Sequence, residues 1–275
     1  MPHWLGLTTD SLSIAILGIL SLSIVLVVKY FLKTTPQNLL VSFNEKSESS
    51  KKNTKKPSFL TGLKFIFQHK YLMSIFAVNF IYELIITIFD FNFKLAAGTL
   101  YQGVALSNYL SFYSSSVNIV SLLCLILGIS NVTRFLGIGV ALTAMPLIFG
   151  AALFSFLSFD SLPFLFTLMV GSKAINYALN GPALKQLYIP TTTDVRFKAQ
   201  AWIETFGSRT SKEVGSLFNM LLNPFQSIFG MIAGKANYII LSGLVGFPLL
   251  ALWFFVTLYL GRKFTKAIDE KKTIC

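Results

Sequence analysis

Long apolar runs constrain this chain more than any other feature of its sequence. Seven runs come close to the length of about 20 residues with which a helix crosses a bilayer, whereas a buried helix of a soluble domain needs only about 10–14. They cover residues 12–32, 71–93, 114–130, 134–157, 162–180, 213–233 and 238–260. With 54% hydrophobic and 12% charged residues, the composition also fits membrane proteins. We therefore predict an all-α polytopic membrane protein with about seven transmembrane helices.

The basic residues lie in alternate connections between these runs. The formal net charge of +12 is typical of proteins that bind nucleic acid, but this distribution indicates membrane topology instead. Segments 33–70, 131–134, 184–212 and 261–275 hold nineteen Lys and Arg residues, and the segments on the other side hold two. Because Lys and Arg collect on the cytoplasmic side, we expect the N-terminus outside and the C-terminus in the cytoplasm.

The same boundaries divide the chain into four parts. Residues 1–32 form an N-terminal transmembrane helix, 33–70 a basic cytoplasmic linker that is disordered by composition, 71–261 a six-helix bundle, and 262–275 a basic cytoplasmic tail. Within the cytoplasmic loop 184–212, apolar residues at steps of three and four predict a short amphipathic helix at the membrane interface, capped by Asp194 and ended by Gly207. Thr210 with Glu213 then resembles a capping box for the next span.

Enzyme chemistry has little support in this sequence. Cys124 and Cys275 form neither a disulfide framework nor a metal-binding spacing, and His3 and His69 have no ligand partners nearby. The GxxxxGK[ST] phosphate-binding loop is absent, and no cluster offers a nucleophile with a base. We expect neither catalysis nor a bound cofactor.

One run carries a continuous stripe of polar residues. In 71–93 and just beyond, the stripe has steps of four, four, three and four, and it comprises Asn79, Glu83, Thr87, Asp90 and Lys94. The alternative for Asp90 and Lys94 is a simple i, i+4 ion pair at the membrane edge with a structural role only. Glu83 lies deeper and is harder to explain in that way.

A lysine lies near the middle of run 162–180. Lys173 shares one helical face with Asn176 and Asn180, and a lysine at mid-bilayer depth costs about 3 kcal/mol. The alternative is a lysine whose ammonium group reaches the lipid headgroups, as happens near helix ends. We interpret Lys173 as facing a partner or a water-filled path.

Two further runs carry polar stripes, a weak one in 114–130 and a stronger one in 213–233. The stronger stripe comprises Glu213, Ser216, Asn219, Asn223 and Gln226, although such residues also join membrane helices by hydrogen bonds. Among the six runs after the linker, the third and sixth lack polar faces. This distribution of polar faces is expected of one six-helix half of a major-facilitator-like transporter, and run 12–32 would be one additional helix before that half. In such transporters the substrate site lies between the two halves, near the middle of the membrane.

The segment 171–216 resembles the ATP/ADP translocase family of nucleotide transporters. The resemblance is carried by Ser172-Lys173, Tyr177, Leu179, Pro182, Leu187-Tyr188-Ile189-Pro190, Val195 to Ala199, Trp202-Ile203 and Gly207-Ser208, with Asp90 and Lys94 in support. It extends over about residues 12–262 as the C-terminal part of a twelve-helix protein.

The resemblance implies exchange of adenine nucleotides, ATP against ADP, by alternating access in a bacterial inner membrane or a plastid-type envelope. It implies that Lys173 binds phosphate and that Asp90 occupies a position where the family usually has glutamate. We expect the substrate site to comprise Asn79, Glu83, Asp90, Lys94, Lys173, Asn176, Asn180 and Asn223. Expected partners are ATP and ADP, the lipid bilayer, and the missing N-terminal half or a second copy, but no nucleic acid.

Two alternatives remain open at this point. Asn176 stands where the family usually has a basic residue, which leaves a permease for another nucleotide or another anionic metabolite possible. A non-transporting interaction module or fragment, in which the stripes only join helices, is the other alternative.

Overall fold

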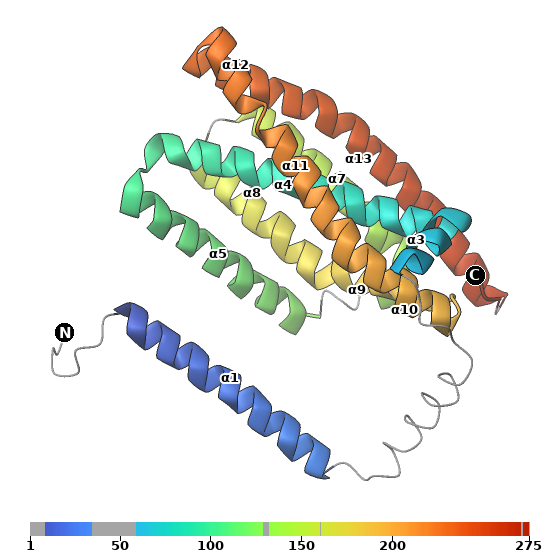
Figure 1. Cartoon of the computed structure of the whole chain (residues 1–275). Coiled ribbons are helices and arrows are strands. Elements are labelled where there is room, and N and C mark those ends of the chain that lie inside the picture. The colour runs from blue at the N-terminus through green and yellow to red at the C-terminus, as the bar shows by residue number, and fades with distance from the viewer. Residues whose placement is uncertain (1–8, 35–58, 129–131, 160, 271, 275) are drawn as a thin grey trace. The chain divides into compact units, whose positions relative to one another are not determined.

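The computed structural model describes residues 9–34, 59–128, 132–159, 161–270 and 272–274, and all regular structure in these ranges is helical (Figure 1). The chain divides into two compact units, residues 1–57 and 58–275. The first contains the apolar helix α1 (Thr9–Thr34). The centre of the predicted linker lies outside the described residues, whereas its last part forms helix α3 (Phe59–Gln68).

Six helices in the described part of the chain are long and apolar enough to cross a membrane. They are α1, α4 (Lys70–Leu100), α5 (Gly103–Ile126), α7 (Gly137–Ser158), α8 (Leu162–Ile175) with its continuation to Gln186, and α13 (Met231–Asp269). The predicted class, an all-α polytopic membrane protein, is confirmed.

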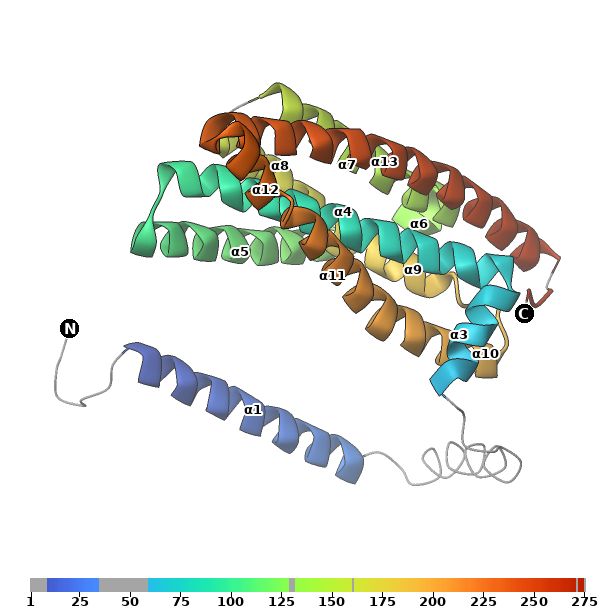
Figure 2. The ribbon, with the colours of Figure 1, turned by 45° about the horizontal axis from the view of Figure 1, so that its top comes forward.

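Helix α4 runs through the middle of the second unit. Helix α13 packs against α7 and α4, α5 packs against α8, and α11 (Ser208–Asn219) lies along α4 (Figures 1 and 2). Short α12 (Leu222–Phe229) lies against the start of α13, and α10 (Thr193–Trp202) packs on α3. A four-residue helix, α6 (Val132–Phe135), precedes α7. Thus α4 contacts most of the elements around it.

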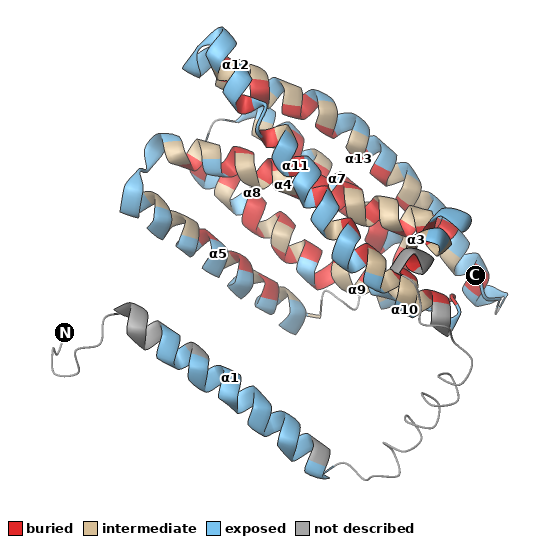
Figure 3. Ribbon diagram, viewed as in Figure 1, coloured by how far each residue is buried: buried red, intermediate tan, exposed pale blue. Residues whose placement is uncertain are grey.

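Aromatic side chains fill the space between α4, α7 and α13. The ring centroids of Tyr82, Phe149 and Trp253 are 5.8 to 6.0 Å apart, and Trp253 is fully buried. Buried residues gather on the inner faces of these helices, and much of α5 is exposed (Figure 3). Because lipid tails are as apolar as these side chains, close packing rather than burial from water holds such helices together.

Glycines let α7 and α13 approach closely. A Cβ atom on Gly261 would lie 2.7 Å from the Cα atom of Gly139, a distance that real side chains do not adopt. The two backbones therefore touch at this crossing, as is common between membrane helices.

The prediction of one unbroken helix over residues 213–233 is wrong. Helix α11 ends at Asn219, α12 occupies Leu222–Phe229, and Gly230 with φ +82° begins α13. Pro224 lies in the first turn of α12, where its missing N–H costs nothing, whereas within a longer helix it would remove a hydrogen bond. The regular spacing of polar residues continues across this break, so the sequence pattern gave no sign of it.

The predicted separate interfacial helix is also wrong in its boundaries. Helix α10 has Thr192 rather than Asp194 at its N-cap position, and it continues through the π-helical segment η3 (Ile203–Gly207) into α11. Gly207 keeps helical angles, so Thr210 and Glu213 lie inside a helix and form no capping box. A Cβ atom on Gly207 would lie 3.1 Å from the Phe76 ring, so glycine serves packing there and does not end the helix.

Two segments that the sequence predicted to be connections between spans are largely helical. Helix α4 extends to Leu100, and α5 begins at Gly103, eleven residues before the predicted start, so only Tyr101 and Gln102 join them. Near the end of the chain, α13 continues through the first part of the predicted tail to Asp269.

Candidate functional site

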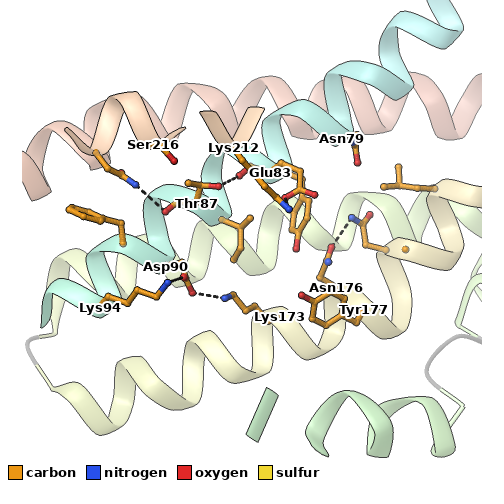
Figure 4. Close-up of a pocket in the computed structure, with 17 residues that line it drawn as sticks. Asn79, Glu83, Thr87, Asp90, Lys94, Lys173, Asn176, Tyr177, Lys212 and Ser216 are labelled. Carbon is orange, nitrogen blue, oxygen red and sulfur yellow. Dashed lines mark hydrogen bonds and ion pairs between the residues drawn. The ribbon is translucent and has the colours of Figure 1, made fainter. Parts of the chain in front are cut away.

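A cavity of about 650 Å³ opens between α4, α8 with its continuation, and α11 (Figure 4). This volume lies within the range of about 300–1,000 Å³ for small-molecule sites. The side chains in its lining that carry a polar atom are Asn79, Tyr82, Glu83, Thr87, Asp90, Lys94, Lys173, Asn176, Tyr177, Asn180, Lys212, Ser216 and Asn219. Charged and amide groups from three helices thus face one space.

Asp90 holds the two cations at one side of this cavity. The Lys173 ammonium lies 2.5 Å from Asp90 Oδ1, and the Lys94 ammonium lies 2.6 Å from Asp90 Oδ2. The Asp90 and Lys173 side chains are only 20% and 18% exposed, whereas Lys94 is 52% exposed. One carboxylate therefore pairs with two ammonium groups, which leaves a local excess of positive charge.

Tyr113 of α5 supports this cluster. Its hydroxyl lies 3.4 Å from Asp90 Oδ1, to which it donates, and the Lys173 ammonium is 5.1 Å from the centre of its ring. An aromatic face attracts a cation, and this attraction increases where water is excluded. Lys173 consequently points between helices and not toward lipid.

A second ion pair joins α4 to α11. The Lys212 ammonium lies 3.5 Å from Glu83 Oε2, and Glu83 is 16% exposed while Lys212 is 56% exposed. The helices meet closely beside this pair, because a Cβ atom on Gly215 would lie 2.9 Å from Thr87 Cβ. With all groups ionised, three lysines and two carboxylates give the cavity a charge of +1.

Amide side chains lie along the helix that continues from Lys173. Asn180 Nδ2 donates to Asn176 Oδ1 at 2.9 Å, and both residues are buried. On α4, Asn79 Nδ2 donates to Ser208 Oγ at 2.9 Å. Tyr177 lies between Asn176 and Asn180 in the sequence and lines the cavity. Its side chain is 55% exposed, so its ring is available to a ligand.

Both flanking helices contain a π-helical segment, and one of the two segments lines the cavity. Segment η2 (Asn176–Asn180) joins α8 to α9 (Gly181–Gln186), and η3 joins α10 to α11. Such segments are rare and occur frequently at functional sites, because the wider turn changes which side chains face inward. Here η2 carries Asn176, Tyr177 and Asn180, which all line the cavity.

The cavity brings together seven of the eight residues predicted for the substrate site. The exception is Asn223, which belongs to α12 beyond the break after α11 and does not line the cavity. Its prediction depended on an unbroken helix over 213–233. The roles of the other seven stay predictions.

The predicted site residues did not include six residues with a polar side-chain atom that line the cavity: Tyr82, Thr87, Tyr177, Lys212, Ser216 and Asn219. Lys212, Ser216 and Asn219 follow at steps of four and three, so a stripe beginning at Lys212 was present in the sequence. The stripe was missed because Lys212 was assigned to the cytoplasmic loop 184–212. Asn219 is further fixed by the Tyr238 hydroxyl, which donates to its Oδ1 at 2.7 Å.

Comparison with known proteins gives a family match over most of the chain. The family model described as TLC ATP/ADP transporter matches residues 5–264. The ADP,ATP carrier protein 1 of Rickettsia prowazekii (strain Madrid E) is 26% identical over 244 residues, which cover 81% of this chain and 48% of the relative. The proteins of the same name from Rickettsia typhi and Rickettsia conorii are 26% and 24% identical and cover 81% and 80% of this chain, each at 48% of their own length.

These relatives are about twice as long as the matched region. The chain spans about half the length of the curated relatives it matches. No solved structure gives a significant match. The apolar helices together with the family match identify an integral multi-pass membrane protein, and the matched proteins are carriers.

Proposed function

We propose, because this chain belongs to the TLC ATP/ADP transporter family, that it provides one half of a membrane carrier that exchanges ATP for ADP by alternating access. Exchange needs no hydrolysis, which agrees with the absence of a phosphate-binding GxxxxGK[ST] loop from the sequence. The substrate site of such carriers lies between helices near the middle of the membrane.

The observation that carries this proposal is the direction of Lys173. Its ammonium group lies in a cavity that also contains Asp90 and Lys94, and its side chain is only 18% exposed. ATP and ADP are polyanions, and a site for them within a bilayer must supply cations where charges attract strongly. Lys173 and Lys94 supply such cations to the phosphates.

The other predicted residues receive roles from their chemistry. Asp90 holds the two lysines in place while the site is empty, because it pairs with both ammonium groups. Asn79, Asn176 and Asn180 are hydrogen-bonding groups suited to the ribose and the base. Glu83 adds a carboxylate on the same face of α4.

The topology of the carrier follows from the charges in its connections. Cytoplasmic placement of the segments around 33–70, 184–212 and 261–275 puts the N-terminus outside and the C-terminus inside. The second half of the carrier, or a second copy of this chain, would complete the path around the cavity. The membrane is a bacterial inner membrane or a plastid-type envelope.

A permease for another anion is the second candidate function, and Asn176 favours it. The family usually has a basic residue at this position, and an asparagine there lowers the positive charge that the cavity offers to phosphate. The cavity would then suit a nucleotide or metabolite with fewer negative charges.

Counterflow in lipid vesicles tests the proposed exchange. Vesicles that contain the chain are loaded with unlabelled ADP, and uptake of labelled ATP is compared with uptake into empty vesicles and into protein-free vesicles. We expect uptake only where ADP is inside. Uptake that is independent of internal nucleotide would contradict exchange, and uptake of other anions but not of ATP would favour the second candidate.

A further inference from the structure

A groove of about 480 Å³ lies where the end of α3 and the start of α4 meet the second half of α13 (Figures 1 and 2). It shares no lining residue with the cavity that contains Lys173. The proposed exchange of nucleotides gives it no role. Its lining combines an apolar floor with a cationic rim.

The floor of this groove is apolar and open to the outside. It is formed by Phe67 of α3, Met73 of α4, and Phe255 and Val256 of α13. Phe67 and Phe255 are each 67% exposed. Because α4 and α13 are long and apolar enough to cross a membrane, an exposed floor between them suits the hydrocarbon chain of a lipid.

Two lysines lie at the rim. Lys70 is the first residue of α4 and lines the groove. The Lys263 ammonium lies 6.0 Å from the centre of the ring of Tyr259, which also lines the groove, so Lys263 turns back toward it. Both lysines are exposed, and in the described part of the chain neither forms an ion pair. The described residues that line the groove include no carboxylate, so the rim suits an anion.

The depth of this rim corresponds to the headgroup layer of a membrane. Lys70 and Lys263 belong to segments 33–70 and 261–275, which the proposed topology places on the cytoplasmic side. Tyr259, like many tyrosines of membrane proteins, lies where the apolar part of its helix ends. The groove thus offers cations at headgroup depth and apolar side chains below them, in the order in which a phospholipid carries its phosphate and its acyl chains.

A neighbouring groove between α7 and α13 lacks this charge. It is lined by Arg262 and Lys266, but also by Asp269 and Glu270, and the Lys266 ammonium lies 3.7 Å from Glu270 Oε1. Two cations and two carboxylates cancel there. Charge complementarity to an anion therefore favours the groove between α4 and α13.

We propose that this groove binds an anionic phospholipid, with its phosphate between Lys70 and Lys263 and an acyl chain along Phe255 and Val256. Cytoplasmic leaflets are rich in anionic lipids, and basic residues near such a surface attract them. The lipid bridges α4 and α13. The inference goes beyond nucleotide exchange and takes only the depth of the two lysines from the proposed topology.

Photolabelling in lipid nanodiscs tests this inference. The purified chain is placed in phosphatidylcholine nanodiscs that contain a small fraction of phosphatidylglycerol with a diazirine in its acyl chain, or of phosphatidylcholine with the same group. Labelled positions are found by mass spectrometry. The variants are Lys70→Gln with Lys263→Gln, and Lys70→Arg with Lys263→Arg. Thermal melting checks that each is folded.

Lys272→Gln is the matched control. Lys272 is a 75% exposed lysine near the same end of α13, it pairs with Glu270, and it does not line the groove. Its removal changes the charge near the same membrane surface by the same sign without touching the proposed site.

We expect the phosphatidylglycerol probe to label residues 255–259 several-fold more than the phosphatidylcholine probe. One lysine near an anionic headgroup contributes about fivefold in affinity, so labelling in the double glutamine variant should fall at least about fivefold. The double arginine variant and Lys272→Gln should resemble the wild type. Excess inorganic phosphate should not reduce labelling, because it does not occupy the apolar floor.

Four results would overturn the inference. They are equal labelling by the two probes, unchanged labelling in the double glutamine variant, loss of labelling with inorganic phosphate, and no labelling of the groove, as expected if α1 or another protein covers it. If the double glutamine variant unfolds, the ratio of the two probes in the wild type still decides. Nanodiscs expose both leaflets to the probes and contain no nucleotide, so neither the orientation of the chain nor a failure of nucleotide exchange affects the result.

Discussion

Lys173 and Asp90 are 83 positions apart in the sequence, yet their side chains form an ion pair of 2.5 Å between α8 and α4. A sequence pattern can place each residue on a polar helix face, but only the packing of the two helices brings them together. The ion pair therefore holds α4 against α8 and also contributes two of the charged groups of the cavity.

Stability should respond unequally to the loss of each partner. Asp90→Asn leaves two lysines without a carboxylate, and we expect a loss of about 1–3 kcal/mol, seen as a lower melting temperature. Lys173→Gln should cost less, because Asp90 keeps Lys94. The double variant should lose less than the sum of the single losses, and additive losses would show that the two residues do not interact.

Chemical protection should locate the substrate in the cavity. In a chain with Cys124→Ala and Cys275→Ala, we introduce Ser216→Cys, because Ser216 lines the cavity and is exposed. ATP should slow its reaction with a polar thiol reagent several-fold. Lys185→Cys is the control, because Lys185 is exposed outside the cavity and should react at the same rate with or without ATP. Equal protection at both positions would indicate a general change in the protein.

Close contact between α7 and α13 should make Gly261 intolerant of any side chain. Gly261→Ala places a methyl group 2.7 Å from the Gly139 Cα atom, and we expect a destabilisation of about 1–3 kcal/mol. Gly150→Ala on α7 is the control, since no atom lies within 4 Å of the added methyl group. The melting temperatures of the two variants are compared. Similar values would mean that the two helices separate without cost.

Tyr238 should influence nucleotide binding from outside the cavity. Tyr238→Phe removes the hydroxyl that donates to Asn219, a residue of the cavity wall. Hydrogen bonds between membrane helices contribute about 0.6 kcal/mol on average, so the melting temperature should fall only slightly. Binding of ATP should weaken by about two- to threefold, because only the longer bond from Asn219 Nδ2 to the Thr87 carbonyl oxygen, 3.4 Å, then holds the amide. Unchanged binding would exclude Asn219 from substrate contact.

The sequence predicted what depends on helical periodicity within one apolar run. Asn79, Glu83, Asp90 and Lys94 follow a regular helix, and all four line the cavity. Periodicity failed where the helix itself changed. The break before Pro224 removed Asn223 from the wall, and the continuous helix through Gly207 moved Lys212 onto it.

The sequence pattern alone could not show that the helix breaks before Pro224 or that it continues through Gly207. Gly207 has the sequence features of a helix end, but it keeps helical angles, and a Cβ atom there would lie 3.1 Å from the ring of Phe76, a residue far away in the sequence. The sequence pattern also gave no sign of the π-helical segment η2, whose residues Asn176, Tyr177 and Asn180 all line the cavity.

The most direct test of the account is the affinity of the chain for ATP with and without the ammonium group of Lys173. Equilibrium binding is measured for the wild type, Lys173→Gln, Lys173→Arg and the control Lys185→Gln, which removes an exposed lysine that does not line the cavity. We predict at least about tenfold weaker binding for Lys173→Gln, partial recovery for Lys173→Arg and no change for Lys185→Gln. Binding of ATP to Lys173→Gln with wild-type affinity would contradict it.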